Sequence, residues 1–170
     1  MKLAGAVLII MAGYLTGLWI LRPYKEHIAL LQEGNHLFCL MDSEVRHRKI
    51  PLTDLAARLS GKTESAWRLF FLQLGRILEE KPDQDYLEIF EQLLEWYPGN
   101  ELTAEERKLF FRFGEAILTG DHTLQRDCAG RFSTELMNDV MSLRKELKNR
   151  EKVIRIFCTA MSILVIIILI

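Results

Sequence analysis

The sequence predicts an all-α protein, an antiparallel six-helix bundle flanked by N- and C-terminal transmembrane helices. Three observations predict this class: both ends of the 170-residue chain are apolar, nearly all charged residues lie between them, and apolar residues there recur at helical spacing. Ends as apolar as these exclude a simple soluble protein and a disordered one. The predicted organisation is a transmembrane helix at 3–21, a cytoplasmic helical bundle at 22–152 and a transmembrane helix at 153–170.

The first apolar run, Leu3–Leu21, has 19 residues and no charge. About 20 helical residues cross about 30 Å of hydrocarbon, so this length suits one span. A cleaved signal peptide is the competing interpretation, because one basic residue, here Lys2, before an apolar run also describes a signal peptide. The run is not followed by a small-x-small cleavage site, which favours an uncleaved anchor.

Gly13 and Gly17 lie four residues apart in this run. Such a pair lets a second helix approach closely, so these two glycines are candidates for helix packing in the membrane. The alternative is that glycine is simply common in membrane helices.

The second apolar run, Ile156–Ile170, has 15 residues. At about 1.5 Å per residue it reaches only about 22 Å, which is short of a full span. Adding Val153 and Ile154 lengthens it, provided that Arg155 bends its charged head back to the interface. We expect a second anchor, and the alternative is a tail buried in a partner protein.

Basic residues gather beside both runs and predict the orientation. This membrane-proximal basic face consists of Arg22, Lys25, Arg144, Lys145, Lys148, Arg150, Lys152 and Arg155. Since basic residues favour the cytoplasmic side, the middle of the chain is predicted to be cytoplasmic, with both termini on the far side. Each Lys or Arg close to anionic headgroups is favourable by roughly 1 kcal/mol.

Proline and glycine residues mark the predicted helix ends in the middle segment. One helix is predicted to begin just past Pro23, and a short one runs from Pro51, at a first-turn position, to Gly61. Pro82 is predicted to stop the third helix. The predicted inward stripes of these helices are Ile28, Leu31, Phe38, Met41 and Val45; Leu52, Leu55 and Leu59; and Trp67, Phe70, Phe71, Leu74, Ile77 and Leu78.

Three more helices complete the predicted bundle. Asp83 or Asp85 caps the fourth, and Pro98-Gly99-Asn100 is a turn. Thr103 and Glu106 form a capping box that opens the fifth. Gly120 closes the fifth helix, Asp121 caps the sixth, and the sixth continues into the second span. Their inward residues are Leu87, Phe90, Leu93 and Leu94; Leu109, Phe110, Phe113 and Ile117; and Leu124, Cys128, Phe132, Leu136, Val140, Leu143 and Leu147.

Motifs of enzyme chemistry are missing from the sequence. It has no G-x-x-x-x-G-K-[ST], G-x-S-x-G or H-E-x-x-H pattern. His36 and Cys39 have the spacing of two metal ligands, but a packed cysteine beside a surface histidine is favoured because no second pair completes the site. The three scattered cysteines suit a reducing compartment. We therefore expect no enzymatic activity, no cofactor, no metal and no small-molecule substrate.

Charge is distributed unevenly along the middle segment. The whole chain has a net charge of −1, which argues against nucleic acid as a partner. From Asp83 to Glu106 it carries eight acidic residues and no Lys or Arg. This stretch is either a solvated face or a docking surface for a basic partner protein, with Tyr86, Trp96 and Tyr97 beside it. The candidate docking residues are Asp85, Glu88, Glu91 and Glu95.

Several short motifs resemble those of one known family over the whole chain. They are Lys2-Leu3-x-Gly5-Ala6 at the opening of the chain, Leu40-x-x-x-Glu44-Val45 followed by Pro51-Leu52 and Leu55, and Asp121-x-x-x-Gln125 after a glycine-containing turn. With the two anchors, the length and the motif order, the chain resembles the stage III sporulation protein AB family.

The resemblance implies a fold, a place and partners. The fold is a cytoplasmic six-helix bundle similar to the cytoplasmic domains of the type II secretion F component. The place is the mother-cell membrane facing the forespore, in a secretion-like channel complex needed for sporulation. The partners are a secretion-type ATPase, other membrane subunits of that complex and membrane lipids. A non-enzymatic assembly platform follows, and the alternatives are a membrane-anchored regulator and a lipid-modifying enzyme.

Overall fold

A computed structural model describes the backbone of residues 2–48, 50–80, 86–98, 101–118 and 122–169. Within these ranges the side chains at 2–10, 13, 14, 16, 18, 47, 48, 122–129, 155, 158 and 162–169 are outside the description. The predicted caps and stops at Pro82, Asp83, Asp85, Gly120 and Asp121 lie outside the described residues, as do Gly99 and Asn100 of the predicted turn and the side chains of Leu124 and Cys128.

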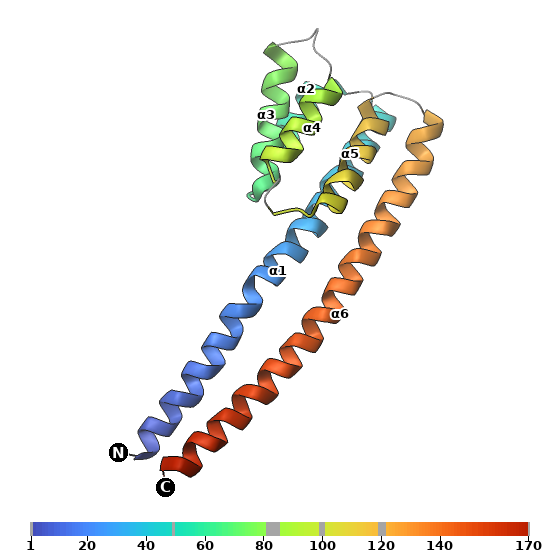
Figure 1. The fold of residues 1–170 in the computed structure, drawn as a ribbon. Coiled ribbons are helices and arrows are strands. Elements are labelled where there is room, and N and C mark those ends of the chain that lie inside the picture. The colour runs from blue at the N-terminus through green and yellow to red at the C-terminus, as the bar shows by residue number, and fades with distance from the viewer. Residues whose placement is uncertain (1, 49, 81–85, 99–100, 119–121, 170) are drawn as a thin grey trace. The chain divides into compact units, whose positions relative to one another are not determined.

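The described part of the chain consists of six α-helices and contains no strand, which confirms the all-α class. Their bounds are α1 Lys2–Arg48, α2 Leu52–Ser60, α3 Ala66–Glu80, α4 Tyr86–Trp96, α5 Ala104–Leu118 and α6 His122–Leu169 (Figure 1). The chain forms two compact units, one made of residues 1–28 and 141–170 and the other of residues 29–140. We call these the two-helix unit and the bundle unit.

The prediction that a helix begins after Pro23 is wrong, because α1 continues through Pro23 without a break. Proline removes one backbone donor and its ring opposes the carbonyl four residues earlier, so it usually ends or kinks a helix. Here packing restrains the chain on both sides of Pro23. Leu21 is buried, and the Tyr24 hydroxyl accepts a hydrogen bond from Arg150 of α6.

Aromatic rings form the core of the bundle unit. Phe38 of α1 lies at its centre, with seven rings between 4.9 and 6.2 Å from its own centroid: Trp67, Phe70, Phe71, Phe90, Phe110, Phe113 and Phe132. Phe113 and Phe132 stack at 4.3 Å. The indole N–H of Trp67 donates to the Leu30 carbonyl at 2.9 Å, so this buried polar group is satisfied.

Most residues of the predicted inward stripes are buried, which confirms the helical periodicity. Those that are only partly buried are Val45, Leu52, Ile77, Leu87, Leu109, Leu143 and Leu147. Leu143 and Leu147 belong to the two-helix unit, and the other five belong to the bundle unit.

Most of the described helix caps and helix ends agree with the prediction. The Thr103 amide donates to Glu106 Oε2 at 2.7 Å, and the Glu106 amide donates to Thr103 Oγ1 at 3.3 Å, so the capping box is confirmed. Gly61 ends α2 as predicted. Pro51 is the N-cap of α2 and not its first helical residue, because its ψ of 138° is extended. The Tyr97–Pro98 peptide bond is cis.

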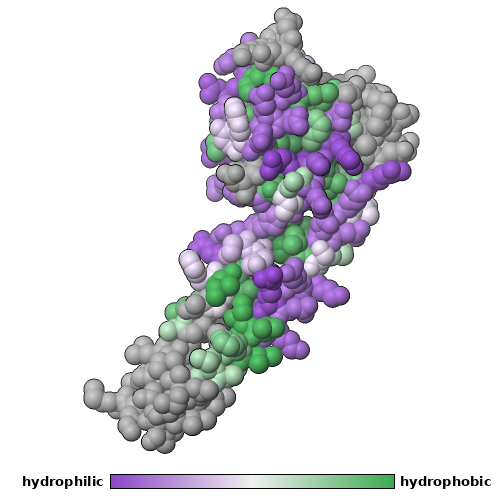
Figure 2. Space-filling view, viewed as in Figure 1, coloured by the Kyte–Doolittle hydropathy of each residue, from purple (hydrophilic) through white to green (hydrophobic). Residues whose placement is uncertain are grey.

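The two-helix unit consists of the N-terminal part of α1 and the C-terminal part of α6, which run side by side (Figure 1). On the face shown in Figure 2, hydrophilic residues cover most of the described part of the bundle unit, and hydrophobic residues gather beside hydrophilic ones over the described part of the two-helix unit. Over the side chains that are described, no helix combines the length and the apolarity that crossing a membrane requires. The predicted spans at 3–21 and 153–170 lie partly outside those side chains.

Candidate functional site

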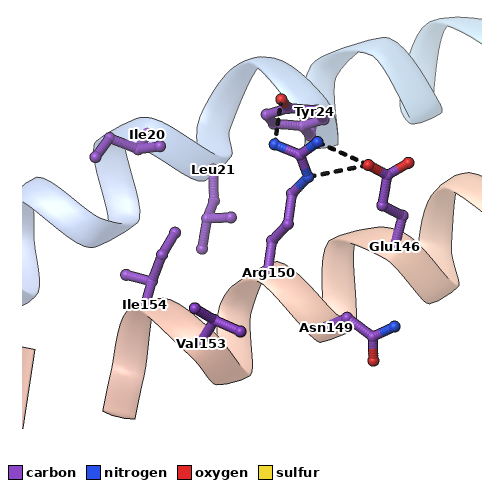
Figure 3. Close-up of a pocket in the computed structure, with 8 residues that line it drawn as sticks. All are labelled: Ile20, Leu21, Tyr24, Glu146, Asn149, Arg150, Val153 and Ile154. Atoms are coloured by element: carbon purple, nitrogen blue, oxygen red, sulfur yellow. Dashed lines mark hydrogen bonds and ion pairs between the residues drawn. The ribbon is translucent and has the colours of Figure 1, made fainter. Parts of the chain in front are cut away.

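A polar cluster joins α1 and α6 within the two-helix unit. Arg150 donates from Nη1 to the Tyr24 hydroxyl at 2.8 Å, and from Nη2 and Nε to Glu146 Oε1 at 2.7 and 3.1 Å (Figure 3). The Arg150 guanidinium carbon lies 4.8 Å from the centroid of the Tyr24 ring, which adds a cation–π contact. Beside it, Lys25 Nζ lies 2.9 Å from Glu151 Oε1.

Local sequence explains half of this cluster. Glu146 and Arg150 are four residues apart on α6 with the acid nearer the N-terminus, which is the favourable order for a helical ion pair. The hydrogen bond to Glu146 is the first cause, and Tyr24 the second, of a raised pKa for Arg150. Arg150 therefore remains a cation, held between one carboxylate and one aromatic ring.

A cleft of about 370 Å³ opens next to this cluster. Four apolar side chains line one part of it and four polar ones line the other: Ile20, Leu21, Val153 and Ile154, then Tyr24, Glu146, Asn149 and Arg150 (Figure 3). Such a lining suits an amphipathic molecule, with an apolar tail against the aliphatic side chains and a polar group at Asn149 and Arg150.

The structure divides the seven residues of the predicted membrane-proximal basic face whose side chains are described into two groups. Arg22, Lys25 and Arg150 pair with Glu26, Glu151 and Glu146, and Arg144 also has a partner. Lys145, Lys148 and Lys152 are exposed and make no ion pair with the described residues. The side chain of Arg155 lies outside the description.

The acidic stretch is exposed on α4. Glu88, Glu91 and Glu95 are exposed and follow helical spacing, so they share one face, and Trp96 beside them is 67% exposed. Asp85 lies outside the described residues. The other acidic residues of the stretch do not all belong to a solvated face, because Glu106 is buried, with its carboxylate in the capping box.

Two residue pairs were also considered in the sequence: Gly13 with Gly17 for helix packing, and His36 with Cys39 for metal binding. Gly17 is buried in the two-helix unit, whereas position 13 is outside the described side chains. His36 is exposed and Cys39 is half-buried, with its Sγ 3.7 Å from Asn35 Oδ1. Burial is the first cause of a raised pKa for the Cys39 thiol, and the charge of Asp42 is the second. Among the described residues, no group of three or more His, Cys, Asp or Glu side chains could hold a metal ion.

The structure contains two polar contacts that were not predicted from the sequence. Arg46 Nη2 donates to both oxygens of Asp42, at 3.0 and 2.7 Å, and Asp42 is buried. Their i,i+4 spacing was a usable signal. The contact between Tyr24 and Arg150 joins residues 126 positions apart, so no local pattern could have revealed it.

The fold and its charged surfaces define a class, an all-α protein with an aromatic core in the bundle unit and two long helices, α1 and α6, that each contribute residues to both units. The profile of one protein family, described as stage III sporulation protein AB, matches residues 2–170. The chain therefore belongs to the stage III sporulation protein AB family, which assigns it a role in sporulation. Comparisons with curated proteins and with solved structures each found no match.

Proposed function

We propose that the chain is a non-enzymatic, membrane-anchored assembly component of the secretion-like channel complex between mother cell and forespore. The family match over residues 2–170 supports the link to sporulation. The observation that carries the anchoring is that α1 and α6 run as uninterrupted helices through both uncharged ends of the sequence. The cluster of Tyr24, Arg150 and Glu146 would then hold the two helices together close to the membrane surface.

Cysteine labelling tests the anchoring. In a variant without the three native cysteines, Glu91→Cys and Ala160→Cys are introduced one at a time and treated with a membrane-impermeant maleimide. Under the proposal, Glu91→Cys reacts only after the cells are opened, and Ala160→Cys reacts only after detergent is added. Reaction of Glu91→Cys in intact cells, or of Ala160→Cys without detergent, would contradict the proposal.

The acidic face of α4 is the proposed docking surface for a basic partner of the complex, such as the secretion-type ATPase. Three exposed carboxylates beside an exposed tryptophan supply charge complementarity and one large apolar anchor. Replacement of Glu88, Glu91 and Glu95 by Lys is expected to abolish capture of the other subunits from sporulating cells. The matched control reverses Asp54, Glu64 and Glu79, which are also exposed. Unchanged capture by the α4 variant would remove the docking role.

The mixed lining of the cleft favours a second candidate function, an enzyme that acts on lipids. Glu146 and Tyr24 are the groups there that could move a proton, next to the Arg150 cation. Lipid extracts from cells that express the wild type, Glu146→Gln and Tyr24→Phe distinguish the two candidates. A lipid product that the wild type forms and Glu146→Gln does not would establish the enzyme, whereas the platform leaves lipid composition unchanged.

A further inference from the structure

We propose that the side of α6 opposite its contact with α1 binds an acidic amphipathic helix of a partner protein. Five exposed residues form this surface, which we call the lysine face: Met141, Lys145, Lys148, Lys152 and Ile156. All five belong to the two-helix unit. Neither the proposed channel role nor the family match assigns a protein partner to it.

The spacing of these residues places them in one line. Successive members are four, three, four and four residues apart, which is the spacing at which side chains follow one side of an α-helix and meet a neighbouring helix. At about 1.5 Å per residue the line is about 22 Å long, enough for three turns or more of a partner. By the same spacing Glu146 and Arg150, which face α1, lie on the other side of α6.

The charges of the lysine face determine what can bind. Lys145, Lys148 and Lys152 make no ion pair with the described part of the chain, so they carry three uncompensated positive charges at successive turns. An apolar helix packed there would leave these ammonium groups desolvated and unpaired, which is costly. A second copy of the same face would oppose like charges. A helix with carboxylates at matching positions pairs all three.

The N-terminal end of the face favours a protein over a lipid surface. Met141 is 61% exposed, so this end offers an uncovered apolar side chain to a partner helix, whereas Ile156, which is 59% exposed, lies three residues past the predicted start of the second span. If α6 enters the hydrocarbon near Val153, where the second span is predicted to begin, Lys145 lies about 12 Å before that point. The headgroup layer is only about 5–8 Å thick on each side, so Lys145 and Met141 project beyond it.

Site-specific crosslinking tests this proposal in sporulating cells. A photoreactive benzoylphenylalanine replaces Met141 in the full-length chain, and a control chain carries it at the exposed residue Asp54 of the bundle unit. The expected result is a crosslink from position 141, and not from 54, that maps to a partner helix with acidic residues three and four positions apart. A crosslink to phospholipid, to residues 86–96 of another copy of this chain, or to nothing above the control would overturn the proposal.

Charge variants make the same test quantitative. Replacement of Lys145, Lys148 and Lys152 by Gln is expected to lower the crosslink yield about tenfold, because three partly exposed ion pairs are lost. The matched control replaces Arg58, Lys62 and Arg68, three exposed basic residues elsewhere, and is expected to change the yield less than about twofold. Lys148→Glu combined with Glu→Lys at the mapped position is expected to restore the yield. Equal losses in both triple variants, or no restoration, would refute the pairing.

The experiment also separates this inference from the proposed anchoring. Membrane association of each variant is measured by alkaline extraction before crosslinking. If the chain is extracted at alkaline pH but still crosslinks to an acidic helix, the proposed anchoring is wrong and the docking proposal stands. If the chain stays in the membrane without that crosslink, the anchoring stands and the docking proposal is wrong.

Discussion

Two glycines of the bundle unit lie where the surrounding rings leave no room for a methyl group. A Cβ on Gly114 of α5 would overlap the Phe90 ring, and one on Gly34 of α1 would lie 2.5 Å from the Trp67 ring. Rings packed on several sides move only at the expense of their other contacts. These glycines therefore allow the helices to approach closely around the aromatic core.

Gly114→Ala is expected to lower the free energy of unfolding by about 1–3 kcal/mol, because the core is overpacked. Gly130→Ala is the matched control, since a Cβ there meets nothing within 4 Å and alanine favours a helix by up to about 1 kcal/mol. Urea denaturation followed by tryptophan fluorescence measures both. A Gly114→Ala protein as stable as the wild type would show that the Phe90 ring can shift to accommodate the added methyl group without loss of stability.

Phe70 and Leu69 are neighbours on α3 with opposite environments. Phe70 is fully buried, so Phe70→Ala is expected to cost about 3–5 kcal/mol, whereas Leu69 is 47% exposed and Leu69→Ala is expected to cost much less. The same denaturation experiment compares them. A loss below about 1 kcal/mol for Phe70→Ala would mean that the inward face of α3 is assigned wrongly.

Asp139 of α6 has a raised pKa, first because of partial burial and then because of the charges of Glu106, Glu105 and Glu135. The folded chain thus holds this proton to a higher pH than the unfolded chain, whose carboxyl titrates near 3.8. Stability that is present below that pH is lost as the pH rises through the folded pKa. Asp139→Asn is therefore expected to raise the denaturation midpoint at neutral pH, with a gain that shrinks toward pH 3.8.

Asp54→Asn is the control for this titration. Asp54 lies in the first turn of α2, where a carboxylate is favoured by the helix dipole, so its removal is expected to give no gain at neutral pH. An equal effect of both substitutions, or a gain for Asp139→Asn that does not depend on pH, would exclude the stated charge repulsion.

At the scale of an element, the start of α5 depends on two reciprocal hydrogen bonds. Thr103→Ala removes the bond that the Glu106 amide donates, and is expected to cost about 1 kcal/mol. Thr134→Ala is a suitable control, because the Thr134 hydroxyl donates to the Gly130 carbonyl within α6 and caps no helix end. The denaturation midpoints of the two variants are compared. Equal midpoints would show that the Thr103 cap does not stabilise the protein.

At the scale of the whole molecule, the bundle unit has a core of its own. The rings around Phe38 all belong to residues 29–140, so this core needs nothing from the two-helix unit. A fragment of residues 29–140 is expected to unfold in one cooperative transition and to keep the near-ultraviolet circular dichroism of packed aromatic rings. Loss of that signal with helicity retained would indicate a molten fragment whose core depends on the rest of the chain.

The sequence by itself determined the all-α class, the inward stripes and the capping box. These features follow from residues close together in the chain: the 3–4 spacing fixes a helix face, and Thr103 and Glu106 are three positions apart. Family membership also rests on the sequence, through the match over residues 2–170.

Two other features depend on tertiary structure: the course of α1 through Pro23 and the pairing of the basic residues. A local rule ends a helix at Pro23, yet α1 continues there because distant residues pack on either side of it. The basic residues beside the predicted spans look alike in sequence, and only the pairing of Arg150 with Tyr24 and of Lys25 with Glu151 distinguishes them from the unpaired lysines. Those contacts depend on which segments meet in space, and no short stretch of sequence records that.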